Sequence, residues 1–194
     1  MGEKSVQKKK YILEKAKEVF CARGYYGVTM KDIVEACDIS RGGLYLYFAD
    51  TKELFEAILE QETESRQEIF QGNADDTPGD ILLAYLSSRK KEILKKKDNL
   101  SVATCEYLLE NGNEKKDNPM KKQFQEDVKS LEKLISDGVA KEWMVCENPA
   151  VAAKNIMFTL EGLTLHAQTL GITADVIDKE IEYIMGTVGL MVEG

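Results

Sequence analysis

The sequence predicts an all-α protein with a small N-terminal head and a larger C-terminal helical body. Apolar residues recur at spacings of three and four along nearly the whole chain, which is the period of an amphipathic helix. No stretch of useful length alternates apolar and polar residues as a β-strand would. With 194 residues and a hydrophobic content of 43%, the chain is long enough to bury a core in one domain, or in a small domain joined to a larger one.

The head is expected to contain short helices joined by tight turns. The first covers about residues 6–23 and ends at Gly24, because glycine readily adopts the left-handed conformation of a helix C-cap. The next three helices each follow a side chain that can cap a helix N-terminus, namely Thr29, Ser40 and Asp50. Asp32 stands three residues after Thr29, so the two form an acidic version of the capping box.

The helices of the body are longer, and prolines mark where several of them begin. Residues 72–79 form the clearest break, and they end in a cap followed by proline at Thr77-Pro78. The same pattern recurs at Asn118-Pro119 and Asn148-Pro149, and a shorter helix is expected over about residues 102–110. Thr173 or Asp175 caps the last helix. We therefore expect a head over residues 1–50, a linking fourth helix over about 51–71, and a body over 51–194.

Composition excludes several classes of protein. No segment approaches the roughly 20 apolar residues of a membrane-spanning helix, and no apolar signal core follows the N-terminal lysines, so a soluble cytoplasmic protein without a membrane partner is expected. The four cysteines are scattered and there is one histidine, which argues against a disulfide framework and structural zinc. We expect no metal and no cofactor.

The net charge of −8 hides an asymmetry between the head and the body. Residues 1–50 contain nine Lys and Arg against seven Asp and Glu, whereas residues 51–194 contain 17 against 27. A slightly basic head on an acidic body is compatible with a head that binds nucleic acid and a body that does not contact phosphate.

The last two helices carry apolar residues on more than one side. A helix that is apolar around most of its circumference must be covered on several faces, and a second copy of the chain is a natural cover through a two-fold four-helix interface. A well-buried hairpin within one chain is the alternative. The residues predicted to form the dimer interface are Ile156, Leu160, Leu163, Ile177, Ile181, Ile184 and Val188.

Residues 29–48 have the layout of a helix-turn-helix, in which the first turn of the second helix faces the major groove. Gly42 and Gly43 are poor helix formers, and two of them in a first turn favour close approach of the backbone to DNA over a frayed helix start. Arg41 beside them can donate two parallel hydrogen bonds to a guanine. Tyr45 and Tyr47 carry hydroxyls suited to phosphate oxygens, although one of the two rings could belong to the core.

The head resembles the TetR family of transcriptional repressors over about residues 10–60. The motifs that carry this resemblance are Gly24-Tyr25, residues 29–33, Ser40-Arg41-Gly42, residues 44–48 and residues 52–55. The resemblance implies that DNA is contacted by Thr29, Lys31, Ser40, Arg41, Gly42, Gly43, Tyr45, Tyr47 and Lys52. The chain departs from the family pattern at Asp38, where the turn often has glycine, and at Thr51, where a lysine is common and Lys52 follows one residue later.

The resemblance also implies a mechanism. Members of the family bind palindromic operators in double-stranded DNA as homodimers and are released when a small-molecule effector enters the C-terminal domain. The sequence does not identify the effector. Candidate effector-binding residues are Tyr85, Cys105, Tyr107, Trp143, Phe158 and His166, each of which could instead be an ordinary core residue.

Three other functions remain open at this point. A helical adaptor without sequence-specific DNA binding would show no salt-dependent affinity for DNA. A DNA-binding activator, or a regulator that senses no ligand, fits the same residues as a repressor. An enzyme would need Cys105 or Cys146 as nucleophile with His166 as base, but no third orienting residue accompanies them, so no enzymatic activity is expected.

Overall fold

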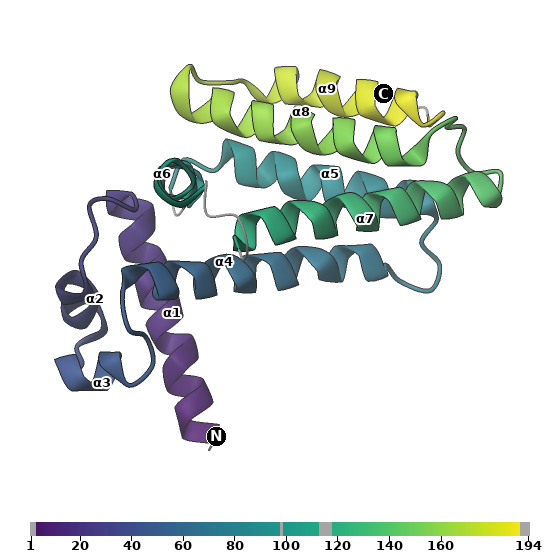
Figure 1. The fold of residues 1–194 in the computed structure, drawn as a ribbon. Coiled ribbons are helices and arrows are strands. Elements are labelled where there is room, and N and C mark those ends of the chain that lie inside the picture. Colours follow the sequence, from purple (N-terminus) through teal and green to yellow (C-terminus); the bar gives the residue numbers. More distant parts are fainter. Residues whose placement is uncertain (1–2, 98, 113–117, 191–194) are drawn as a thin grey trace. The chain divides into compact units, whose positions relative to one another are not determined.

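A computed structural model describes residues 3–97, 99–112 and 118–190. Within these ranges the chain forms nine α-helices and one 3-10 helix, and none of these residues lies in a β-strand, which confirms the all-α prediction (Figure 1). The helices are α1 (Glu3–Arg23), α2 (Met30–Cys37), α3 (Arg41–Tyr45), α4 (Thr51–Gln67), the 3-10 helix η1 (Glu68–Gln71), α5 (Pro78–Leu94), α6 (Ser101–Asn111), α7 (Pro119–Ala140), α8 (Pro149–Thr169) and α9 (Ala174–Thr187). No helix of the described part is long and apolar enough to cross a membrane.

The chain divides into two compact units. The N-terminal unit comprises residues 1–62 and 96–119, and the C-terminal unit comprises residues 63–95 and 120–194. The division falls within α4, later than the expected boundary at residue 50. It also assigns α6 to the N-terminal unit, although the sequence places this helix in the middle of the expected body.

Several N-terminal caps are formed as predicted. Thr29 and Thr77 each complete a capping box, with Asp32 and Asp80 respectively. Ser40 Oγ accepts a hydrogen bond from the Gly43 backbone at 3.1 Å. At the start of α9, Thr173 occupies the cap position but its side chain caps no backbone group. These interactions stabilise helices locally because they satisfy N–H groups that have no partner within the helix.

The N-terminal unit has an apolar core where α1, α2, α3 and the first part of α4 meet. Ile39 is half-buried in it, and the apolar residues buried there include Ile12, Phe20, Ile33, Leu44, Phe48 and Leu54. Gly24 has a φ of 73°, as expected for the left-handed end of α1.

Helix α6 completes this core from a distant part of the sequence. Tyr107 is buried and its ring lies 5.4 Å from the rings of both Tyr25 and Phe55. Glu106 Oε2 accepts hydrogen bonds from the backbone N–H groups of Tyr25 at 2.6 Å and Tyr26 at 3.0 Å. The turn after α1 is therefore held by a carboxylate about eighty residues later in the chain.

The C-terminal unit packs α5, α7, α8 and α9 around a second apolar core, with α8 and α9 side by side (Figure 1). This packing bears on the predicted dimer interface. Six of its seven residues are buried within the chain, and Leu163 is partly buried against the same core; the six are Ile156, Leu160, Ile177, Ile181, Ile184 and Val188. The chain itself thus covers the side chains of the predicted interface.

Candidate nucleic-acid interface

The turn between α2 and α3 has the geometry of a helix-turn-helix. Asp38 adopts the left-handed conformation with φ 50° and ψ 49°, so aspartate fills the position where the family often has glycine. Thr29 Oγ1 donates to Asp32 Oδ2 at 2.5 Å, and Arg23 pairs with the other carboxylate oxygen of Asp32 at 2.5 Å. Hydrogen bonds from Thr29, together with Arg23, lower the pKa of Asp32 to about 2. The start of α2 is thus fixed by an ionised carboxylate.

Helix α3 is attached to the core by one side chain and is otherwise exposed. Leu44 is fully buried, whereas Arg41, Gly42 and Tyr45 are exposed. The Arg41 guanidinium lies over the Tyr45 ring, 5.5 Å from its centroid, which orients it without burying it. A Cβ at Gly42 would meet no atom within 4 Å, so the core does not require glycine there.

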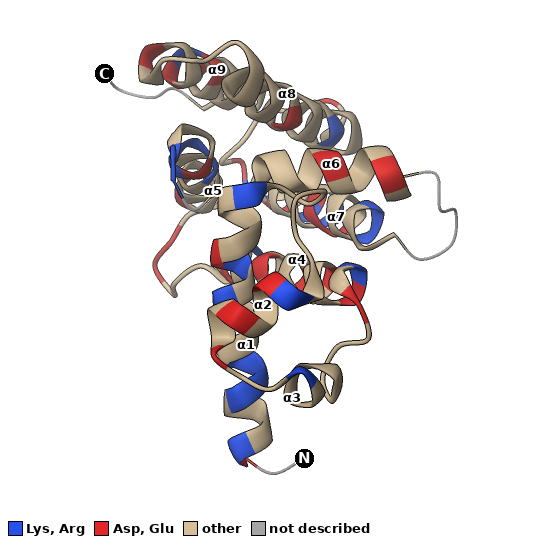
Figure 2. Ribbon diagram, turned by 90° about the vertical axis from the view of Figure 1, so that its left-hand side faces the viewer, with Lys and Arg blue, Asp and Glu red and all other residues tan. Residues whose placement is uncertain are grey.

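The N-terminal half of α1 adds positive charge beside α3. Lys9 Nζ lies 5.5 Å from the centroid of the Phe48 ring, and Ser5 Oγ donates to the Tyr47 hydroxyl at 3.4 Å. Lys4, Lys8, Lys9 and Lys10 are all exposed, and Figure 2 shows basic residues along this part of α1. Sequence reasoning missed these lysines as site residues. The run of three lysines on the first predicted helix was the available signal.

Other predicted contact residues are less free to bind phosphate. The Thr29 hydroxyl already donates to Asp32, and Lys31 Nζ lies 3.6 Å from a carboxylate oxygen of Glu35 on an exposed surface. At the start of α4, where Lys52 is half-buried, Asp50 Oδ1 accepts from the Glu53 backbone at 2.8 Å. Carboxylates thus already occupy this helix N-terminus, which disfavours an approaching phosphate.

The structure does not bring the six candidate effector-binding residues together. Cys105 and Tyr107 lie in the N-terminal unit, where Tyr107 donates to Glu56 Oε1 at 2.6 Å. Burial raises the pKa of the Cys105 thiol, which disfavours its reactive thiolate form. The other four belong to the C-terminal unit: Trp143, Phe158 and His166 are exposed, and Tyr85 is buried.

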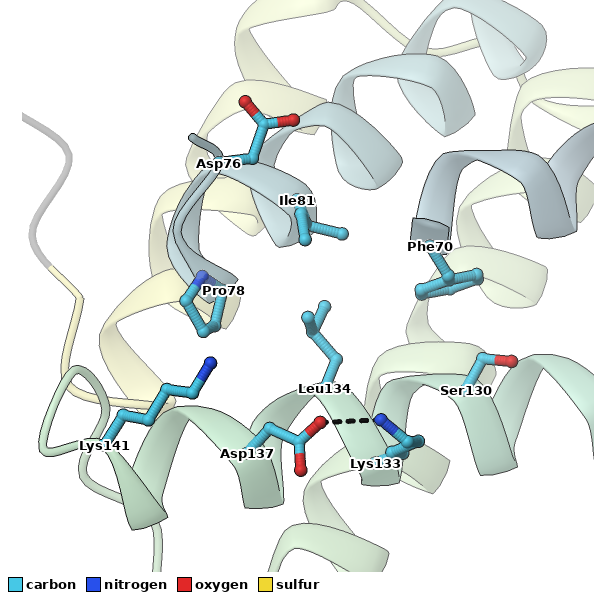
Figure 3. A pocket seen from close by; sticks show the side chains of 9 residues that line it. All are labelled: Phe70, Asp76, Pro78, Ile81, Ser130, Lys133, Leu134, Asp137 and Lys141. Atoms are coloured by element: carbon cyan, nitrogen blue, oxygen red, sulfur yellow. Dashed lines mark hydrogen bonds and ion pairs between the residues drawn. The ribbon is translucent and has the colours of Figure 1, made fainter. Parts of the chain in front are cut away.

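The C-terminal unit contains a small pocket between the start of α5, η1 and the second half of α7. Its volume is about 200 Å³, and none of the six predicted residues lines it. Figure 3 shows Phe70, Ile81 and Leu134 extending toward the same space, with Lys133 paired to Asp137 at the edge. A site of this size suits a small ligand, since pockets for drug-sized molecules measure roughly 300–1,000 Å³. The described residues offer no group of His, Cys, Asp and Glu that could hold a metal ion.

An exposed apolar stripe runs along α8 and α9, and within it the Phe158 ring also stacks on Phe124 of α7, with 5.4 Å between the ring centroids. On α8 it consists of Val151, Phe158 and Leu165, each seven residues apart, and on α9 of Val176 and Tyr183 with the same spacing. Phe158 and Tyr183 are 59% and 72% exposed. Gly162 and Gly186 interrupt the stripe, and a Cβ at either would meet no atom within 4 Å. Small residues on an exposed apolar face allow another helix to approach closely.

Comparisons with known proteins agree with this geometry. Residues 12–58 match the family model described as bacterial regulatory proteins, tetR family. Residues 81–178 match the model described as tetracyclin repressor-like, C-terminal domain. The first match spans the whole helix-turn-helix, and the second runs from α5 to the start of α9.

Similar proteins and structures extend the likeness over nearly the full length. The uncharacterised HTH-type transcriptional regulator YfiR of Bacillus subtilis is 30% identical over 159 residues, which cover 80% of this chain and 78% of YfiR. The crystal structure of reduced E. coli NemR superposes with a TM-score of 0.78 at 14% identity, covering 96% of this chain and 100% of that one. AibR, solved in complex with isovaleryl coenzyme A and operator DNA, has a TM-score of 0.61 at 21% identity, covering 91% and 97%.

Proposed function

This chain belongs to the TetR family of bacterial DNA-binding transcriptional regulators, and from that premise we propose that it is a repressor. In this proposal a homodimer in the cytoplasm binds a palindromic operator and is released by a small-molecule effector. The observation that carries the proposal is the exposed first turn of α3, where Arg41 projects from a helix anchored by one buried leucine.

Base recognition is assigned to the start of α3. The Arg41 guanidinium has the fork geometry that matches the O6 and N7 acceptors of guanine in the major groove. Gly42 and Gly43 let the α3 backbone approach the base edges, and Ser40 lies beside them. Tyr45 and Tyr47 are assigned to phosphates around this turn. Thr29, Lys31 and Lys52 are assigned to the same backbone, and Thr29 and Lys31 exchange their contacts with Asp32 and Glu35 for phosphate when DNA binds. Lys8 and Lys9 extend the same basic surface and supply non-specific attraction to the phosphate backbone.

Dimerisation is assigned to the exposed stripe on α8 and α9. Contiguous exposed apolar side chains on a monomer are typical of protein interfaces. The stripe holds two aromatic side chains at its centre, and aromatic residues are enriched at such interfaces. Pairing two copies of this surface around a two-fold axis would produce the four-helix interface expected from the sequence, with different residues in contact.

In this proposal an effector releases the dimer from DNA by changing the distance between its two α3 helices. A dimer reads half-sites about 34–36 Å apart, one helical turn of DNA, so its two α3 helices must be held at a matching distance. A ligand weakens operator binding only if it binds better to a conformation in which that distance is wrong. The solved complex of AibR with both an acyl-coenzyme A and operator DNA shows that one member of this fold accommodates both kinds of partner.

Selection of bound sequences from random double-stranded DNA, using the purified full chain, tests the proposal. We expect an enriched palindrome whose half-sites are centred one helical turn apart, and an affinity for it that falls steeply with salt concentration. A single unrepeated half-site would contradict the dimer. Failure to enrich any sequence, with no salt-dependent binding, would favour the helical adaptor instead.

Transcription from a promoter carrying the selected operator then separates a repressor from an activator. A repressor lowers the transcript level when the protein is added, whereas an activator raises it. The measurement is an in vitro transcription assay with and without the chain, using a promoter with a scrambled operator as the control.

A further inference from the structure

The interior of the C-terminal unit contains a cluster of polar side chains from α4, α5 and α7. Asp127 and Arg89 are 1% and 9% exposed. The Nε atoms of Arg66 and Arg89 are both buried and have no hydrogen-bond partner among the described residues. Buried donors in native proteins are nearly always paired, so these two guanidinium nitrogens call for a partner from outside the chain, either ordered water or a bound ligand.

The groups already present in the cluster do not satisfy these nitrogens. Arg89 pairs through Nη1 with Glu92, and Asp127 Oδ1 accepts from Gln67 Nε2 at 2.7 Å. Burial raises the pKa of Asp127, while the charges of Arg66 and Arg89 act in the opposite direction. Both arginines are thus close enough to act on the carboxylate, but their Nε–H groups do not bond to it.

The pocket described above borders this cluster. Ser130, which lines the pocket in Figure 3, also donates to Gln67 Oε1 at 2.7 Å. Gln67 Nε2 in turn donates to Asp127 Oδ1. The ring of Phe70, which also lines the pocket, has its centroid 4.8 Å from that of Tyr85. Along α5, Ile81 lines the pocket and Tyr85 and Arg89 follow one and two turns later. The pocket and the buried arginines therefore occupy successive levels of the same α5–α7 interface. Phe70, Ile81 and Leu134 form an apolar side of the pocket, and the remaining lining residues are Pro78 and the polar or charged Asp76, Ser130, Lys133, Asp137 and Lys141.

We propose that this region binds a small amphipathic anion, with Arg66 and Arg89 donating Nε–H hydrogen bonds to its acidic group and the pocket taking its apolar tail. Guanidinium groups are well suited to carboxylate and phosphate oxygens, and such charge-assisted bonds are strong where water is excluded. The Asp127 carboxylate repels the incoming negative charge. A chain with a neutral side chain at this position, Asp127→Asn, should therefore bind the anion more tightly. This inference deepens the proposed effector control and rests on it.

Calorimetric titration of the full chain with octanoate and octyl phosphate tests the site, with octanol as the neutral probe of equal tail length. We expect at least one anion to bind and octanol to bind much more weakly; the better anion identifies the acidic group. Arg89→Gln and Arg66→Gln should each lower the affinity about tenfold or more, because each loses a buried charge-assisted donor. Asp127→Asn should raise it, and Lys91→Gln, an exposed cation on the same helix, should leave it unchanged.

Several outcomes would overturn the proposal. These are no binding of either anion to the folded chain, equal binding of octanol, or equal losses in Lys91→Gln and the arginine variants. Circular dichroism of each variant identifies any that fails to fold, and two arginine positions and Asp127→Asn keep the test decisive. Since the titration contains no DNA, its result is independent of operator selection. An operator without an anion site overturns this inference alone, and an anion site without an operator overturns the proposed function.

Discussion

The two units distribute polar and apolar side chains in opposite ways. The N-terminal unit closes its apolar core and exposes cationic groups, with Arg41 on α3 and lysines on α1. The C-terminal unit exposes aromatic rings at Phe158 and Tyr183 and buries the charged Arg89 and Asp127. An exposed cation is suited to phosphate, an exposed apolar stripe to another protein surface, and an unpaired buried donor to a small acceptor. The contrast assigns a different class of partner to each region.

The largest effect is expected where α8 contributes to the core. Leu160→Ala should lower the free energy of unfolding by about 2–5 kcal/mol, because it removes a fully buried side chain and leaves a cavity. Leu165→Ala, on the exposed stripe, is the matched control and should change the stability of the isolated chain by at most about 0.5 kcal/mol. Urea unfolding at low protein concentration measures both. Equal losses would mean that the stripe is also part of the core.

A charged substitution tests whether the exposed stripe forms the dimer interface. Phe158→Asp should weaken dimerisation by about 2 kcal/mol or more, because an aromatic side chain central to an interface is replaced by an unpaired carboxylate. Sedimentation velocity over a range of concentrations measures the change. Ser136→Asp places the same charge on an exposed position of α7 and should leave association unchanged. A Phe158→Asp variant that remains as dimeric as the parent would move the interface elsewhere.

The cationic surface of the N-terminal unit divides into specific and non-specific contacts. Arg41→Ala should cost about 1–3 kcal/mol on the selected operator and relax the preference at one base pair per half-site. Lys31→Gln should instead weaken binding to all DNA sequences. It should also reduce the slope of log affinity against log salt concentration by about one, the value for one phosphate contact. Gel-shift titrations at several salt concentrations distinguish the two. Unchanged operator affinity in Arg41→Ala would contradict its role in base recognition.

A smaller effect is expected at Gly42, and it has opposite signs for folding and binding. Gly42→Ala should stabilise the free chain by up to about 1 kcal/mol, since alanine favours the helix and the added Cβ meets open space. The same Cβ should weaken operator binding if the α3 backbone lies against DNA. Thermal unfolding and gel-shift titration of one variant measure both changes. Unimpaired DNA binding would show that the backbone does not approach closely.

The last prediction concerns pH. Because hydrogen bonds from Thr29 and the charge of Arg23 lower the pKa of Asp32 to about 2, its ionised form stabilises the fold above the ordinary carboxylate pKa near 3.8. Asp32→Asn should be less stable than the parent at neutral pH, and the difference should shrink as the pH falls from about 4 through about 2. Urea unfolding across this range measures it. A difference independent of pH would mean that shape rather than charge fixes the start of α2.

Local interactions explain which parts of the fold could be predicted from sequence. The caps at Thr29, Ser40 and Thr77 join groups three residues apart, so a short motif contains the whole interaction. The left-handed turn at Asp38 is a property of one residue and was also predictable. The family resemblance located α3 because its motif is continuous in the chain.

Interactions between distant segments explain the rest. The periodicity of α8 and α9 showed two apolar sides, but not which one the chain itself covers, and the predicted interface was assigned to the covered side. Nothing near Arg89 in the sequence indicates that it is buried, since Asp127, the carboxylate of the buried cluster, comes from another helix. The six predicted effector residues were chosen by type, and only Tyr85 lies beside the buried cluster.

The hydrogen bonds from the α1–α2 turn to Glu106 have a consequence for how the protein is made. A ribosome delivers the helix-turn-helix first, but Tyr107 must also emerge before the ring cluster around Phe55 is closed. During that interval the nascent chain presents unsatisfied aromatic surface, so the N-terminal unit matures only after more than half of the polypeptide has been synthesised. A chimeric regulator that borrows this DNA-binding unit must therefore carry residues 101–111 with it.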